Sequence, residues 1–434
     1  MDTKKIFVYF LFFGIIISFF YGFLTGENSA GAGGYNGDLS WIKKNIEIFQ
    51  NNNIIDSIKH PDIFGNRPPL IYILNKLFNP FFYDLEKYRT CVFILSLLGP
   101  LFLFIGLKIK FKDTKNEYLA LLSVIILLSP YYRTSAFWAL NENYGIITGI
   151  LSLVFLNLSL SSSSKEETKS NLYYIITIFF SSLCVYFDQK LIIVPLICVF
   201  TFLFHLKKIR TKFLICCGYA FLSIPFLYLI FLWNGIVPIK TQLANPNTIT
   251  NLSRVSDFYF INIGYATTMI SFYLFPLIFF KQNLTFNLKR FFLDKQNFAM
   301  IAFIFIYIIL LLNYFNFEKY TVDEYWVGLG YIDKISKIMF SDIVMREYFT
   351  YFSFLASWLI LIYFLDKKTS NFLILFYFYF ISILLWPLMQ EYFDPLIVIF
   401  GLMIFLSKIK INFYNLIFTI FYFSIFIVSA NIYY

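Results

Sequence analysis

Residues 4–38 read KKIFVYFLFFGIIISFFYGFLTGENSAGAGGYNGD, an apolar run that gives way abruptly to glycines and polar residues. The apolar part, Ile6–Leu24, has the length that an α-helix needs to cross the hydrocarbon core of a membrane. Two lysines precede the run, which places that end on the inner side. Ser29-Ala30-Gly31-Ala32 has the small residues of a signal-peptidase site, but the run is long for a signal core, so we expect an uncleaved first helix.

The composition of the whole chain also indicates a membrane protein. Of its 434 residues, 59% are hydrophobic and only 14% are charged, whereas about a quarter of a soluble domain is charged. We therefore predict an all-α polytopic membrane protein that forms one integral membrane domain over residues 1–434. The net charge of +10 does not indicate nucleic-acid binding, because the lysines lie in short clusters between apolar runs, where they set membrane orientation.

Apolar runs of near-spanning length recur along the chain and are separated by polar breaks. They predict about thirteen transmembrane helices. The predicted spans are Ile6–Leu24, Tyr88–Leu107, Glu117–Tyr131, Tyr144–Leu160, Leu172–Phe187, Leu191–His205, Phe213–Trp233, Phe258–Phe280, Phe298–Phe315, Tyr348–Leu365, Phe372–Met389, Leu396–Ser407 and Phe413–Ala430.

Lysine-rich breaks such as Lys207–Lys212 fall on the inner side if the N-terminus is cytoplasmic. Three long segments then lie outside: residues 25–87, 234–257 and 316–347. Leu39–Phe49 and Tyr331–Phe340 are amphipathic, and we expect the second to lie as an interfacial helix on the outer leaflet. The excess of Phe, Ile, Tyr, Asn and Lys fits an AT-rich bacterial genome, so we expect a bacterial inner (plasma) membrane protein.

The outer turns mix acids, bases, aromatic residues and proline, whereas the inner loops are plain Lys, Ser and Asn segments. This contrast predicts chemistry at the outer surface, seated in the first long loop. The candidate residues of the outer loops and turns are Asp38, Arg67, Arg133, Glu142, Asp188, Gln189, Lys190, Trp233, Asn234, Glu391 and Asp394. Five cations have the predicted height of lipid phosphates: Arg67, Arg89, Arg133, Lys190 and Arg254.

The first loop carries a family resemblance. It is long, it contains an acidic residue, and it closes in Asn66-Arg67-Pro68-Pro69-Leu70-Ile71-Tyr72, which resembles the His-Pro-Pro-Leu-Tyr entry of the GT-C superfamily of membrane glycosyltransferases. Glu142 stands where many members have an acidic residue at the start of span four. A narrower resemblance is to the glucosyltransferases that complete the lipid-linked N-glycan precursor. It rests on Trp233-Asn234-Gly235-Ile236-Val237, which is similar to their pattern after span seven, and in part on Gln189.

This resemblance implies transfer of a sugar, with inversion, from a polyprenyl-phosphate donor to a glycan or lipid-linked acceptor of the cell envelope. Asp38 is then the predicted catalytic base, because a positioned carboxylate can take the proton of an acceptor hydroxyl. Lys190 and Arg67 are predicted to hold the leaving phosphate. The remaining predicted substrate contacts are Glu142, Gln189, Trp233, Asn234 and Glu391.

No cofactor or metal is predicted. The five cysteines and two histidines have no metal-ligand spacing, and the carboxylates do not cluster in the sequence. The expected partners are therefore the donor, the acceptor and the lipid bilayer.

Several of these candidates also have a structural interpretation. Asp38 could belong to an Asn-Gly-Asp turn, Arg67 could snorkel to headgroups, and Glu142 could favour a helix N-terminus. Asp188 and Lys190 could pair locally, and Asp394 before Pro395 is a good helix N-cap.

A different function also stays open, namely a polysaccharide polymerase, ligase or flippase. The span interiors are almost free of charged residues, which argues against a flippase. A polymerase would be expected to depend on the late outer segment 316–347.

Overall fold

The computed structural model describes residues 3–30, 34, 36–65, 67–162, 167–244, 258–281, 291, 294–320, 328–366, 369–385 and 388–434. Within these ranges the chain is helical and forms no strand; it has only two isolated β-bridges. The chain folds into two compact units. Unit 1 comprises Met1–Ser253 and Leu416–Tyr434, and unit 2 comprises Arg254–Asn415.

Nine helices among the described residues are long and apolar enough to cross a membrane, which makes the chain a multi-pass membrane protein. In unit 1 these are Thr3–Thr25, Leu85–Lys110, Glu142–Ser161, Ser170–Phe187, Ile209–Trp233 and Phe413–Tyr433, the last of which belongs to unit 1 from Leu416 onward. In unit 2 they are Asn262–Phe280, Lys295–Tyr314 and Ile343–Phe364. All nine coincide with predicted spans.

The other four predicted spans are shorter or broken. Glu117–Tyr131 corresponds to Asn116–Leu128, which is followed after a 71° bend by Pro130–Phe137. Leu191–His205 corresponds to the shorter apolar helix Gln189–His205, and Phe372–Met389 corresponds to a helix that ends at Ser382. Leu396–Ser407 is a short α-helix, Leu396–Phe400, that continues as a π-helical turn.

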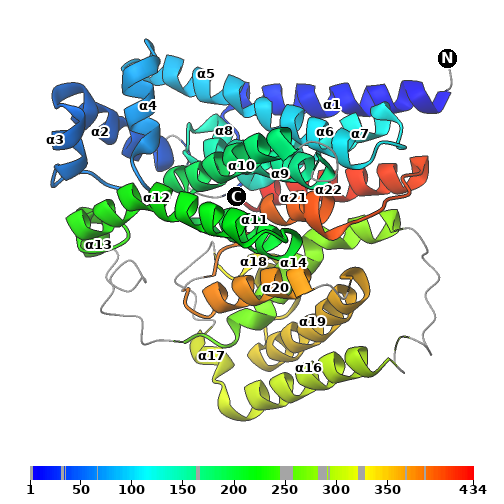
Figure 1. The fold of residues 1–434 in the computed structure, drawn as a ribbon. Coiled ribbons are helices and arrows are strands. Elements are labelled where there is room, and N and C mark those ends of the chain that lie inside the picture. The colour runs from blue at the N-terminus through cyan, green and yellow to red at the C-terminus, as the bar shows by residue number, and fades with distance from the viewer. Residues whose placement is uncertain are drawn as a thin grey trace. The chain divides into compact units, whose positions relative to one another are not determined.

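Unit 1 is built on close helix pairs (Figure 1). α9 (Glu142–Ser162) packs along α10 (Glu167–Phe187), which also contacts α11 (Ile193–His205) and α12 (Ile209–Trp233). α1 (Thr3–Thr25) packs against α7 (Asn116–Ser123), η1 (Val124–Leu128) and α8 (Pro130–Phe137). α5 (Leu85–Ser96) and α6 (Leu98–Lys110) follow the first long loop, and α22 (Phe413–Tyr433) ends the chain.

The first long loop is folded rather than extended. It holds α2 (Asp38–Asn51), α3 (Ile54–Lys59) and α4 (Leu70–Phe78). The amphipathic Leu39–Phe49 stretch falls within α2, whose apolar face is buried. The Asn45 side chain donates to the Tyr72 hydroxyl at 3.1 Å, and Phe49 stacks on the Tyr72 ring. These contacts fix α2 against α4.

Unit 2 centres on α14 (Asn262–Leu274) and α19 (Ile343–Phe364), which cross so closely that a β-carbon at Gly264 would meet the Phe354 ring. η4 (Phe275–Phe280) continues α14. The remaining helices are α16 (Lys295–Tyr314), α17 (Phe317–Tyr320), α18 (Gly330–Met339), α20 (Thr369–Ser382), η5 (Gln390–Tyr392), α21 (Leu396–Phe400) and η6 (Gly401–Phe405).

α18 matches the amphipathic Tyr331–Phe340 stretch. Its Asp333 is buried and pairs with Lys337 at 3.0 Å. Burial raises the pKa of Asp333 and lowers the pKa of Lys334 to about 8. Ile338 and Met339 on the same helix are exposed.

Candidate functional site

Four charged side chains of unit 1 meet around the hydroxyl of Tyr131. The hydroxyl donates a short hydrogen bond to Glu142 Oε1. It accepts hydrogen bonds from Arg67 Nη2 at 3.2 Å and from Lys190 Nζ at 3.1 Å. Arg67 also forms an ion pair with Glu142, and Lys190 Nζ lies 3.6 Å from Asp188 Oδ2. We call Arg67, Tyr131, Glu142, Asp188 and Lys190 the tyrosine cluster.

The acids and the bases of the tyrosine cluster differ in depth. The side chains of Glu142 and Asp188 are only 1% and 4% exposed, whereas those of Arg67 and Lys190 are 22% and 24% exposed. The carboxylates are therefore buried and the cations are reachable from outside.

Local sequence explains how these side chains are placed. Ser129 caps α8 by accepting from the Tyr132 amide, and Pro130 supplies the first helical residue, which starts a new helix at the bend. Asn143 donates to Ser96 Oγ at 2.9 Å and to the Tyr132 carbonyl at 3.1 Å, so the start of α9 beside Glu142 is fixed to α5 and α8.

Lys190 lies in η2 (Gln189–Ile192), between α10 and α11. Asp188 caps η2 by accepting from the Lys190 amide at 3.0 Å. The Asp188–Lys190 turn is therefore a local pair, as the structural interpretation expected, and it is also part of the tyrosine cluster.

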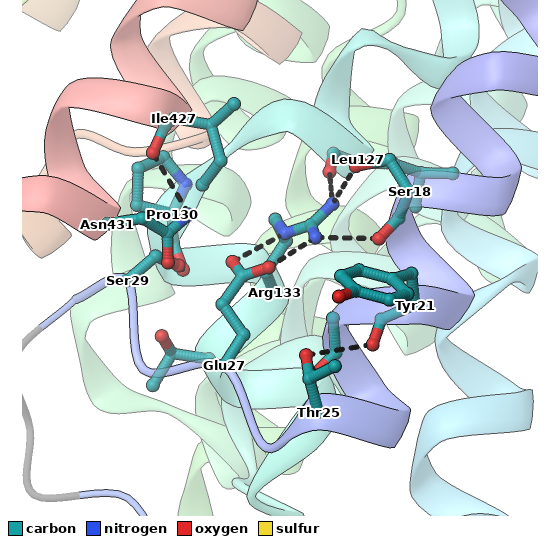
Figure 2. Close-up of polar contacts among 12 residues, drawn as sticks. Ser18, Tyr21, Thr25, Glu27, Ser29, Leu127, Pro130, Arg133, Ile427 and Asn431 are labelled. Carbon is teal, nitrogen blue, oxygen red and sulfur yellow. Dashed lines mark hydrogen bonds and ion pairs between the residues drawn. The ribbon is translucent and has the colours of Figure 1, made fainter.

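Arg133 has a different environment from Lys190 and Arg67. Figure 2 shows its guanidinium held by both carboxylate oxygens of Glu27, with Nε 2.7 Å from Oε1. It also donates to the Ser18 carbonyl at 2.9 Å and to the Leu127 carbonyl at 3.2 Å. Arg133 is 2% exposed, so its charge serves a buried ion pair that joins the start of the first loop to α1 and α8. Glu27 was not among the residues predicted from the sequence.

Arg89 is used in a similar way. It donates to the Phe137 carbonyl at 2.5 Å and to the Phe23 carbonyl at 3.2 Å, and it pairs with Glu86 at 3.2 Å. Its guanidinium lies over the Phe23 and Trp138 rings. Of the five candidate cations, Arg67 and Lys190 meet at Tyr131, Arg89 and Arg133 join helices, and Arg254 lies outside the described residues.

Gly22 makes room for the Glu27–Arg133 pair, because a β-carbon there would overlap Glu27 Oε2, Arg133 Nη2 and the Phe137 ring. We expect Gly22→Ala to destabilise the protein by about 1–3 kcal/mol, the usual range for overpacking. Gly14 lies on the same helix with nothing within 4 Å of such a β-carbon, so Gly14→Ala is the matched control. Thermal unfolding in detergent should show a lower midpoint for Gly22→Ala alone; equal midpoints would contradict this packing.

Asp38 is the first residue of α2 and is half-buried. Arg67 lies three residues before α4, against which α2 packs. The predicted base and the predicted phosphate ligand therefore belong to one folded loop. Asn66, next to Arg67 in the quoted motif, lies outside the described residues.

Trp233 and Asn234 have clear roles in the fold. Asn234 ends α12 in the left-handed conformation, with φ of +50°, as helix C-terminal residues commonly do. The buried Trp233 donates from Nε1 to the Ile58 carbonyl at 3.3 Å. These contacts hold the end of α12 against the first loop, and substrate contact by either residue stays a prediction.

α13 (Ile239–Ala244) makes a second link to the first loop. The Thr241 hydroxyl accepts from the Gly65 amide at 2.9 Å and donates to the Gly65 carbonyl at 3.1 Å. Lys240 pairs with Asp62 at 2.5 Å and, through that hydrogen bond, lowers the pKa of the Asp62 carboxyl.

Several buried side-chain oxygens near the tyrosine cluster have no hydrogen-bond partner within the described part of the chain, and two of them belong to predicted site residues. These two are Glu142 Oε2 and Gln189 Oε1. Glu391 lies in η5 of unit 2 and is half-buried. No group of three His, Cys, Asp or Glu side chains that could hold a metal ion is found in the ranges that the structure describes.

Comparison of the chain with protein-family models, curated proteins and solved structures finds no match. The GT-C resemblance therefore rests on the residues quoted from the sequence.

Proposed function

We propose that this protein is a GT-C-type glycosyltransferase of a bacterial inner membrane. It moves a sugar from a polyprenyl-phosphate donor to a cell-envelope glycan or lipid acceptor on the outer face. The proposal includes about thirteen membrane segments, a cytoplasmic N-terminus and an interfacial α18. The observation that carries it is the tyrosine cluster, in which two partly exposed cations share one oxygen above buried carboxylates.

The cations fit the leaving group of the reaction. A polyprenyl phosphate gains negative charge as its bond to the sugar breaks, and preorganised cations stabilise that charge. Arg67 and Lys190 both reach Tyr131 Oη, so one phosphate can contact both. Glu142 and Asp188 hold the cations from the buried side and leave the other side to the ligand.

Glu142 Oε2 fits the sugar. A buried carboxylate oxygen without a partner is costly, and Glu142 is only 1% exposed. A sugar hydroxyl supplies the missing donor. Gln189 Oε1, one residue before Lys190, is also buried without a hydrogen-bond donor. The cluster thus combines cations for a phosphate with acceptors for hydroxyl groups, as a lipid-linked sugar requires.

We assign the role of general base to Asp38. In the proposed reaction its carboxylate takes the proton of the acceptor hydroxyl while that oxygen attacks the anomeric carbon. The bond from the anomeric carbon to the phosphate oxygen breaks, and the electron pair stays with the lipid phosphate between Arg67 and Lys190.

Removal of one cation tests this assignment. We expect Lys190→Met to lower kcat/KM for the donor by about 10- to 100-fold, because a hydrogen bond to a charged group contributes roughly 1.5–3 kcal/mol. Lys240→Met is the matched control, since Lys240 pairs with Asp62 on the surface. The measurement is release of free polyprenyl phosphate from polyprenyl-phosphate sugars, with acceptor present. Equal turnover by both variants would contradict the role of Lys190.

A further inference from the structure

Tyr131 was not among the residues predicted from the sequence, yet its hydroxyl is the centre of the tyrosine cluster. A phenol has one hydrogen to donate and two lone pairs that accept. Donation to Glu142 and acceptance from Arg67 and Lys190 together use this full capacity. Tyr131 is also only 5% exposed, and with its hydrogen-bonding capacity used in this way it acts on a ligand through its partners.

The three partners come from distant parts of the sequence. Arg67 lies in the first loop just before α4, Glu142 begins α9, and Lys190 lies between α10 and α11. Two cations held this close repel each other unless negative charge lies between them. The phenol oxygen supplies part of that charge, because its donation to a carboxylate polarises the oxygen toward its own donors.

The ring adds to this placement of Lys190, whose Nζ lies 5.1 Å from the Tyr131 ring centroid. The helix that carries the ring is itself well fixed. Ser129 caps α8, and Arg133, two residues after Tyr131, is tied to Glu27. The start of the first loop adds a hydrogen bond from Ser29 Oγ to the Pro130 carbonyl at 3.2 Å.

We propose that Tyr131 is a positioning residue that sets the spacing of Arg67 and Lys190 for a single phosphate monoester or diester of an isoprenoid lipid. This inference rests on the proposed function. Tyr131 acts through the two cations and does not itself contact the phosphate. Without its hydroxyl both cations remain, but the spacing that lets one phosphate contact both is lost.

The test compares two neighbouring tyrosines. Tyr132 follows Tyr131 on α8, is fully buried, and donates its hydroxyl to the Ser96 carbonyl, outside the tyrosine cluster. Tyr131→Phe and Tyr132→Phe each remove one buried hydroxyl and keep the ring. The probe is a short-chain isoprenyl phosphate, titrated calorimetrically into the full-length protein in lipid nanodiscs, with the matching isoprenyl alcohol as the uncharged control.

Wild type should bind the phosphate and not the alcohol. Tyr131→Phe should bind the phosphate about 10-fold more weakly, because Arg67 and Lys190 lose the oxygen that fixes their spacing, while Tyr132→Phe binds like wild type. Equal affinity of Tyr131→Phe and wild type would overturn the inference and leave the proposed function standing. Binding of neither compound by wild type, or of both equally, would instead overturn the proposed function.

Thermal unfolding of the same samples separates a positioning role from a general loss of structure. Tyr131→Phe should unfold within a few degrees of Tyr132→Phe, since each loses one hydroxyl. If both variants lose affinity in step with their unfolding temperatures, the effect is structural and the inference fails.

Discussion

Arg133→Met should be among the most destabilising single substitutions in unit 1, with an expected loss of about 3–5 kcal/mol in the free energy of unfolding. Arg133 is 2% exposed, and its loss leaves the Glu27 carboxylate, itself 10% exposed, without its bidentate partner. It also removes donors to the Ser18 and Leu127 carbonyls. The pair joins α1, the bend before α8 and the start of the first loop, so all three should loosen together.

A double-mutant cycle measures the pair itself. Glu27→Met should be similarly destabilising, because it leaves a buried guanidinium. The double variant should be more stable than the sum of the single losses implies, because no buried charge then remains. Lys240→Met, which breaks the exposed pair with Asp62, should change little. Urea unfolding in detergent, followed by tryptophan fluorescence, gives the free energies of unfolding of the four proteins of the cycle and of the control. Additive losses at Glu27 and Arg133 would contradict the coupling.

Asp38→Asn should reduce sugar transfer by about a hundred- to ten-thousand-fold, the usual contribution of a general base. The change keeps the shape of the side chain and removes its ability to take a proton. Asn is also accepted near a helix start, so α2 should persist. Donor affinity should be nearly unchanged, because the phosphate contacts are assigned to Arg67 and Lys190.

Glu47 offers the matched control for Asp38. It lies on the exposed face of the same helix, so Glu47→Gln removes a carboxylate from α2 at another position. Turnover and donor affinity are measured on all three proteins under one set of conditions. Wild-type turnover by Asp38→Asn would exclude Asp38 as the base, whereas a loss of turnover in Glu47→Gln as well would indicate a general effect on α2.

Much of the helical pattern could be predicted, because a long apolar run has few alternatives to a membrane helix. The predicted single span Glu117–Tyr131 marks where hydropathy alone was insufficient. Ser129-Pro130 is an N-cap followed by a favoured first helical residue, and the structure starts α8 there after a 71° bend. That signal was present in the sequence, but it lay inside an apolar run, and the mean hydropathy of a run does not show where a helix is capped or restarted.

The site was also predictable in part. Arg67, Glu142 and Lys190 stood out as charged residues at predicted helix ends, and the structure brings these three together. Tyr131 did not stand out, because it is one of 33 tyrosines in a chain with 59 phenylalanines. Glu27 was missed because its partner lies more than a hundred residues away, and no local pattern links such a pair.

We propose that the bond between a sugar and a lipid phosphate is broken at the tyrosine cluster. Its most direct test uses the full-length protein in lipid nanodiscs, loaded with a polyprenyl-phosphate donor that carries one label on the sugar and another on the phosphate. With acceptor present, the sugar label should pass to the acceptor while the phosphate label stays on the lipid. Each sugar transferred should leave one free lipid phosphate. Transfer of both labels together, or movement of the intact donor across the bilayer, would contradict the account.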